Sequence, residues 1–170
     1  MAKASDALRL ADEKINRAIK RSINNANLSI VGKEMVDTIK VRTRVGKGVD
    51  NGKLKKLKPL STSYIKLREL YESNLSSLTK PNKSGLTATG QMLDSIRFKI
   101  SGLIRKKIII FFDNKRSGEL SGAKSRLTNS QVAKHVQDNG RPFFEFADTE
   151  VKRFTRRLRK KITDTIRRAL

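Results

Sequence analysis

The sequence contains no cysteine, and this absence excludes several kinds of chemistry. Disulfide bonds, thiolate metal sites and cysteine nucleophiles all require the residue, so none of them is expected. The absence fits a reducing compartment without requiring one. Aromatic residues are also scarce, at 5% of 170 residues, whereas 32% of the residues are charged. We therefore expect a modest core with projecting, solvated elements.

Long apolar runs are missing as well. No segment approaches the roughly 18 to 20 apolar residues that a membrane-spanning helix needs. The first ten residues, MAKASDALRL, include Asp6 and lack the apolar centre of a secretory signal. We therefore expect no secretory signal and no membrane partner.

Acidic residues are few compared with basic ones. The chain has 39 Lys and Arg against 16 Asp and Glu, a formal net charge of +23. An excess this large destabilises a compact monomer by self-repulsion, which indicates a polyanionic partner or neighbour. Nucleic acid is the first candidate, although net charge says nothing about sequence-specific recognition.

Signals for catalysis are weak. His135 is the only histidine, and neither a cysteine nor a group of carboxylates accompanies it. A histidine without such partners is more typical of a structural role than of catalysis or metal binding. No GxxxxGK[ST] motif is present, and the 16 acids are scattered rather than clustered. We predict no enzymatic activity, no metal site and no cofactor.

The stretch 86–100, LTATGQMLDSIRFKI, predicts the centre of the fold. Thr87 and Thr89 are good helix caps, and the residues after them change from helical spacing to strand alternation. Residues 106–112 form a continuous apolar run that predicts a buried strand. The connection is too short for a parallel crossover, so residues 95–101 and 106–112 should pair antiparallel.

Helical periodicity predicts the two ends of the chain. Apolar residues recur at helical spacing through residues 1–45, with a bend or break expected where Asn24 and its neighbours weaken the pattern. Near the other end Asp148 should cap a final helix, on which Phe154 belongs to an apolar stripe. The stripe is expected to consist of Val151, Phe154, Leu158, Ile162, Ile166 and Ala169.

We expect a single domain of the α+β class, in which a small antiparallel sheet packs with a long N-terminal helical region and a C-terminal helix, with extended loops. The glycine- and lysine-rich stretch between the first helical region and the sheet is interpreted as a flexible cationic loop. The predicted sections are a helical region 1–45, a basic loop 46–58, a helix and linker 59–84, a sheet-containing core 85–146 and a helix 147–170.

Three segments in a fixed order carry a resemblance: NGKLKKLKPLSTSYIKLREL, LTATGQMLDSI and VAKHVQDNGRPFFEFADTEV. Together they resemble the tail-completion proteins of tailed bacteriophages, a family of virion-morphogenesis, head–tail joining and neck proteins. The resemblance spans residues 50–155, and it departs from the family at Val136, where glutamine is common. The matching positions are Pro59, Leu60, Ser61, Leu86, Thr89, Gly90, Leu93, Ser95, Ile96, Ala133, His135, Gly140, Arg141, Pro142 and Phe143.

The resemblance implies an assembly role rather than catalysis. Several copies, a hexamer favoured and a dodecamer possible, would form a ring in the virion neck, after assembly in the host cytoplasm. Portal, adaptor or head-completion proteins would adjoin the ring on one side, and tail-tube or tail-terminator proteins on the other. Genomic DNA would pass through the lumen.

Basic residues in two regions are expected to face different partners in such a ring. The planar guanidinium of arginine suits fixed carboxylates, whereas lysine is a compact, strongly hydrated charge. We therefore expect arginines of the last helix, with two phenylalanines before it, to contact neighbouring subunits: Arg153, Arg156, Arg157, Phe143 and Phe144. Lysines of the basic loop are expected to face the DNA path: Lys53, Lys55, Lys56 and Lys58. The loop lysines could instead serve only solubility.

A free-standing nucleic-acid-binding protein without sequence specificity is the alternative. It explains the charge equally well, but it does not explain the order of the three segments. The sequence also lacks the aromatic platform that is usual for binding single strands.

Overall fold

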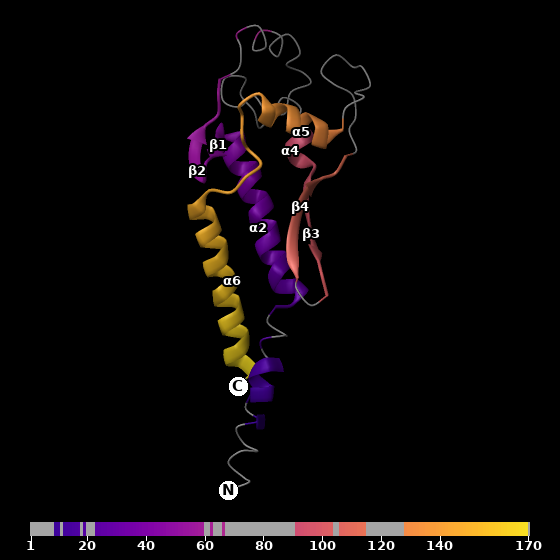
Figure 1. Cartoon of the computed structure of the whole chain (residues 1–170), viewed down its shortest axis with the longest axis vertical. Helices are drawn as coiled ribbons and strands as arrows, with labels where there is room; N and C mark the ends of the chain where they lie inside the picture. The colour runs from indigo at the N-terminus through magenta and orange to yellow at the C-terminus, as the bar shows by residue number, and fades with distance from the viewer. Residues whose placement is uncertain are drawn as a thin grey trace.

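The computed structural model describes residues 9–10, 12–17, 19, 23–59, 62, 66, 91–103, 106–114 and 128–169. In this part of the chain the helix α2 (Asn25–Arg44) lies at the centre, between a two-stranded sheet and the helix α6 (Asp148–Ala169) (Figure 1). The α+β class, the small antiparallel sheet and the C-terminal helix are confirmed.

The expected break in the N-terminal helical region is the start of α2. Asn24 is the N-cap of α2, and its side-chain oxygen accepts a hydrogen bond of 2.8 Å from the backbone N–H of Asn27. A short amide side chain is favoured at this position because it satisfies an N–H group that has no partner within the helix. α2 ends at Arg44, with Val45 as its C-cap.

The predicted pairing of the two central strands is confirmed. β3 (Ile96–Ser101) and β4 (Lys107–Phe112) are antiparallel, with Ile96 opposite Phe112 and Ser101 opposite Lys107. One face of this pair lies against α2, where the ring of Phe98 occupies the space that a side chain at Gly32 would need. The absence of a Cβ at Gly32 therefore allows sheet and helix to approach closely.

The stretch 106–112 contains the predicted strand, but the prediction that this strand is buried is wrong. The residues of β4 from Ile108 to Ile110 are only half-buried, and Phe111 is exposed. A sheet of two strands has its second face covered only if another element packs there, and α2 covers one face. A continuous apolar run does not reveal this difference.

The stretch 46–58 is not a flexible loop, contrary to the sequence interpretation. It forms the antiparallel hairpin β1 (Lys47–Asp50) and β2 (Lys53–Lys56). Asn51 and Gly52 connect the strands with φ angles of 49° and 73°. Asn-Gly is the pair that two-residue hairpin turns favour, because both positions require positive φ. The Asn-Gly pair predicts a hairpin, but the surrounding glycines and lysines are also typical of a loop.

The core lies at the end of α2 that faces α4 (Gln91–Asp94) and α5 (Asn129–Asp138). α5 begins with a capping box, in which Thr128 and Gln131 each bind the other's backbone N–H. This end joins residues from α2, α4, α5 and β3 with Leu57, which follows β2, and Phe143, which precedes α6. The buried cluster is Val36, Ile39, Leu57, Met92, Leu93, Ile96, Ala133 and Phe143.

α6 departs from its prediction at its first turn. Asp148 is the first helical residue rather than the cap, and the residue before it is Ala147. Phe154 is buried as predicted, whereas Val151, expected on the same stripe, is 48% exposed. Phe154 packs edge-on against Phe146, whereas Leu158, Ile162 and Ile166 are only half-buried.

Some predictions concern parts of the chain outside the described residues. They include nearly all of the expected helix and linker 59–84 and residues 115–127 of the expected core 85–146. The positions Leu60, Ser61, Leu86, Thr87, Thr89 and Gly90 also lie outside the described residues.

Candidate functional site

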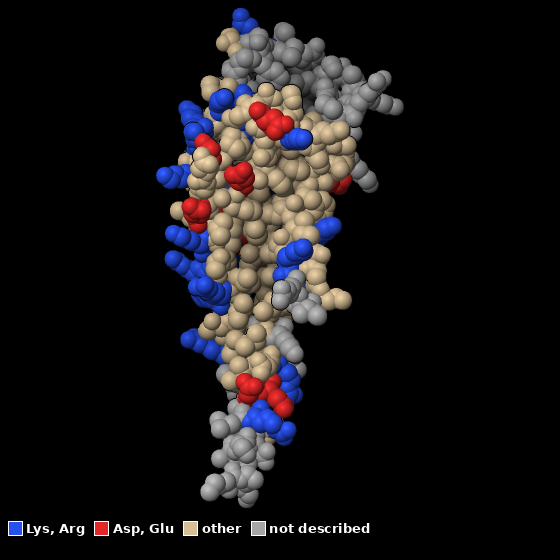
Figure 2. Space-filling model, in the orientation of Figure 1, with Lys and Arg blue, Asp and Glu red and all other residues tan. Residues whose placement is uncertain are grey.

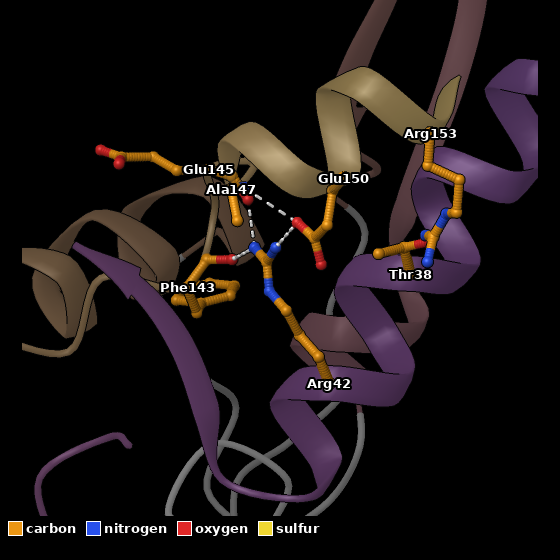
Figure 3. Close-up of polar contacts among 7 residues, drawn as sticks. All are labelled: Thr38, Arg42, Phe143, Glu145, Ala147, Glu150 and Arg153. Atoms are coloured by element: carbon orange, nitrogen blue, oxygen red, sulfur yellow. Dashed lines mark hydrogen bonds and ion pairs between the residues drawn. The ribbon is translucent and has the colours of Figure 1, made fainter. Parts of the chain in front are cut away.

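A buried ion pair joins the end of α2 to the start of α6 (Figure 3). Arg42 on α2 and Glu150 on α6 are each 6% exposed, and Nη1 of Arg42 donates to Oε2 of Glu150. Nη2 of Arg42 donates to the backbone oxygens of Phe143, at 2.7 Å, and of Glu145. Oε2 of Glu150 also accepts from the N–H of Ala147 at 3.0 Å. The guanidinium of Arg42 thus holds both ends of the segment 143–150 against α2.

The electrostatics of this pair indicate a structural role. Burial lowers the pKa of Arg42 from its ordinary value, and the carboxylate of Glu150 opposes this effect. Arginine nevertheless stays charged throughout the physiological range. The carboxylate of Glu150 is engaged by a guanidinium and by a backbone N–H, so its geometry is that of a helix anchor rather than of a general base.

A second, half-exposed contact fastens the next turns of α6 to α2. Glu34 on α2 binds two arginines of α6, with 3.4 Å to Nε of Arg153 and 2.9 Å to Nη1 of Arg157. Arg153 also donates to Oγ1 of Thr38 at 2.8 Å. These two arginines, predicted to pair with acids of neighbouring subunits, have an acidic partner in their own chain. An open groove of about 650 Å³ runs beside this contact, between α2 and α6.

The sequence analysis missed both Arg42 and Glu34. Arg42 lies 108 residues from Glu150, so no periodic pattern connects them. The only available signal was Glu150 itself, an acid in the first turn of the last helix, and that signal predicts a favourable helix dipole and no particular partner.

The outer face of α6 carries basic residues, and Asp148 in the first turn of the helix is the acid beside them. Figure 2 shows Lys and Arg side chains along the left edge of the molecule, where Figure 1 places the β1–β2 hairpin and α6. Positions three or four apart project from the same side of a helix. The exposed basic residues that this spacing places on the side of α6 away from Phe154 are Lys152, Arg156, Arg159, Lys160 and Arg167.

The predicted DNA-path lysines are exposed, but they do not form one surface. Strand alternation places Lys53 and Lys55 on one face of the hairpin and Lys56 on the other. Nζ of Lys55 binds the carboxylate of Asp50 at 2.7 Å. The fourth lysine, Lys58, follows the hairpin, and its side chain lies close against Gly140.

Phe143 and Phe144 were predicted as contacts between subunits. Phe143 is completely buried in the core of its own chain, so this prediction is wrong for Phe143. Phe144 is half-buried, with its ring centroid 4.6 Å from that of Phe112. A run of aromatic residues signals an apolar environment, but it does not distinguish a subunit core from an interface.

The described residues of the three family-like segments meet in space. Nη2 of Arg141, in the third segment, donates to the backbone oxygen of Pro59, in the first, at 2.7 Å. Leu57 of the first segment belongs to the buried core. Leu93 of the second segment and Phe143 of the third share the buried core. The segments therefore form one packed unit.

Two further matching positions have local roles. Ser95 is buried, and its hydroxyl donates to the backbone oxygen of Met92 at 2.7 Å, which closes the turn between α4 and β3. His135 is exposed on α5, and its backbone oxygen accepts from Asn139 at the end of the helix. These geometries stabilise turns and helix ends.

In the described part of the chain no group of three His, Cys, Asp or Glu residues is arranged to hold a metal ion. The described helices also include none that is long and apolar enough to cross a bilayer. Comparison of the chain with known protein families, with curated proteins and with solved structures found no match. The site is therefore interpreted from its own geometry.

Proposed function

We propose that this protein is a structural subunit of the neck of a tailed bacteriophage. Copies of it form a ring that completes the tail or joins the head connector to the tail, and the ring surrounds the path of the DNA. Its mechanism is assembly: subunits bind one another and the adjoining rings, and no covalent chemistry takes place.

The observation that carries this proposal is the convergence of the three family-like segments. They are separated by long stretches of sequence, yet they share one core through Leu93 and Phe143, and Arg141 hydrogen-bonds to Pro59. The matched positions Leu93, Ser95, Ile96, Ala133 and Phe143 are all buried, which is typical of residues that specify a fold. Their packing therefore supports the view that the matched positions specify a common fold.

The charge of the molecule supports the same proposal. A net charge of +23 suits a protein that functions beside genomic DNA. The two carboxylates at the contact between α2 and α6, those of Glu34 and Glu150, are each paired with arginine. Neither of them is left free to activate water, which fits a role in assembly.

Negative-stain microscopy of the purified full-length protein, with analytical ultracentrifugation, tests the proposal. We expect rings with a central channel and a sedimentation coefficient that corresponds to a hexamer or a dodecamer. A variant in the shared core, Leu93→Asp, should abolish the rings because it removes the fold. Monomers at all accessible concentrations, in the absence and in the presence of DNA, would contradict the proposal.

A free-standing nucleic-acid-binding protein is the second candidate, and the basic outer face of α6 favours it. The same images distinguish the two candidates. Rings in the absence of DNA support the neck subunit, whereas monomers that coat added duplex support the free-standing binder.

A further inference from the structure

The spacing of basic residues on α6 produces a row of charge that winds slowly around the helix. Lys152, Arg156 and Lys160 follow one another at intervals of four residues, which corresponds to a rise of about 6 Å per step. Between Glu150 and Asp164 the helix has seven Lys and Arg residues and no acid. We call Lys152, Arg156 and Lys160 the outer row.

No intramolecular partner neutralises the outer row within the described residues. The carboxylate of Glu150 is buried beneath Arg42. Glu34 is engaged by Arg153 and Arg157, which lie on the flank of α6 next to α2. Helical spacing places Asp164 on that same flank. Asp148, in the first turn of α6, lies four residues before Lys152 on the same row, and its carboxylate lies against Gly52. Within the described residues the outer row therefore forms no ion pair with a carboxylate.

The chemistry of this face selects among possible partners. A protein interface needs apolar anchors at its centre, and a helix that binds a membrane surface needs apolar residues that enter the lipid. The exposed residues on the outer side of α6 are basic or polar, including Thr149 and Thr163, and the exposed apolar residue of the helix, Val151, belongs to the stripe of Phe154 instead. Phosphates of a nucleic-acid backbone require charge and no apolar contact.

The hairpin presents a weaker field than α6. Asp50 lies on the same hairpin face as Lys53 and Lys55, and its carboxylate binds Lys55. The carboxylate of Asp148 lies against the hairpin turn at Gly52. Asp148 thus lies beside both surfaces, but the hairpin also has a carboxylate bonded to one of its lysines, whereas no carboxylate is bonded to the outer row among the described residues.

We propose that the outer row of α6 is the surface that binds the backbone phosphates of duplex DNA, without sequence specificity, and that it contributes more to this binding than the hairpin lysines. The proposal deepens the proposed function, because it assigns the DNA-facing surface of the neck subunit. It also reverses the division of roles expected from the sequence, in which arginines of α6 faced protein and hairpin lysines faced DNA.

Two triple variants with the same change of charge test the proposal. One is Lys152→Gln, Arg156→Gln and Lys160→Gln on α6, and the matched control is Lys53→Gln, Lys55→Gln and Lys56→Gln on the hairpin. Each removes three positive charges from exposed positions. Binding is measured by fluorescence anisotropy, with the full-length protein and a labelled duplex of about 30 base pairs across a range of salt concentrations.

The α6 variant should bind the duplex at least about tenfold more weakly at about 100 mM salt. Its slope of log affinity against log salt should fall by about 2 to 3, because each lost phosphate contact removes about 0.9. The hairpin variant should stay within about threefold of the unsubstituted protein, with a slope change below about 1. Two duplexes of unrelated sequence should give the same affinities.

Three results would overturn the proposal. They are a larger loss in the hairpin variant, an equal loss in both variants, and binding of the unsubstituted protein to phosphatidylserine vesicles but not to the duplex. Circular-dichroism melting checks that both variants are folded. Negative-stain images separate this inference from the proposed function: α6-dependent DNA binding by a protein that forms no ring retains the inference and contradicts the neck role.

Discussion

Arginine side chains lie on both sides of α6, one buried on the side that faces α2 and another exposed on the outer side. At the seam between α2 and α6, the guanidinium of Arg42 is buried and bonded to a carboxylate and two backbone oxygens. On the outer side Arg156 is exposed, and no described residue forms an ion pair with it. The same residue type therefore serves the fold on one side and remains available for a partner on the other.

The difference shows how a chain with a charge of +23 can fold. Glu150, the acid that is buried among the described residues, is paired with the buried Arg42, and the partly buried Glu34 is paired with Arg153 and Arg157. Desolvated charges must be paired, whereas exposed charges are stabilised by water and salt. The positive excess therefore remains on the surface, where a polyanion can use it.

The largest expected effect comes from breaking the seam at Arg42. Arg42→Met should lower the free energy of unfolding by about 3 to 5 kcal/mol, because it leaves the carboxylate of Glu150 buried without its partner. Urea denaturation followed by circular dichroism measures the change. The double variant Arg42→Met with Glu150→Leu should recover most of the loss, since no charge then remains buried. A double variant as unstable as the single one would contradict this account.

Phe154→Ala should produce a comparable or slightly smaller loss, of about 3 kcal/mol. The ring is buried and meets Phe146 edge-on, with 5.3 Å between the ring centroids. Val151→Ala, one turn earlier on the exposed end of the same stripe, is the control and should change stability by less than about 0.5 kcal/mol. Equal effects at the two positions would show that the stripe is buried evenly, as the sequence suggested.

The elements of this fold were predictable where local chemistry determines them. The strand pairing around Ser101 and Lys107 follows from alternation and from a short connection, and the start of α2 follows from the capping side chain of Asn24. The hairpin 47–56 was missed although Asn51–Gly52 signals it, because glycine and lysine are also abundant in loops.

The candidate site was predictable only in part. The basic character of α6 is visible as composition and spacing. The division of its arginines into a flank bound to Glu34 and a free outer row depends on where α2 lies. That position is set by tertiary packing between segments more than 100 residues apart, and a single sequence does not encode it as a local pattern.

Glu34→Gln should lower the free energy of unfolding by less than Arg42→Met or Phe154→Ala. The pairs that Glu34 forms with Arg153 and Arg157 are half-exposed, and such pairs contribute about 0.2 to 1 kcal/mol each at most. The loss should diminish as salt is raised, because salt screens exposed charges. Asp37→Asn, on the next turn of α2 and without an ion pair among the described residues, is the control. A loss of stability as large as that of Arg42→Met would mean that Glu34 contributes as much as Arg42 to the contact between α2 and α6.

The smallest expected effect has the opposite sign. Arg156 lies four residues from both Lys152 and Lys160, and like charges at this spacing destabilise a helix by about 0.2 to 0.5 kcal/mol per pair. Arg156→Gln relieves both pairs, so it should raise the free energy of unfolding by about 0.4 to 1 kcal/mol at low salt. The gain should disappear at high salt, where screening already weakens the repulsion. Thr163→Gln, on the same side of α6 but without charge, is the control for helix propensity. Urea denaturation at two salt concentrations gives the comparison. A loss of stability in Arg156→Gln would mean that Arg156 has a partner within its own chain, and the outer row would then not be free to bind phosphate.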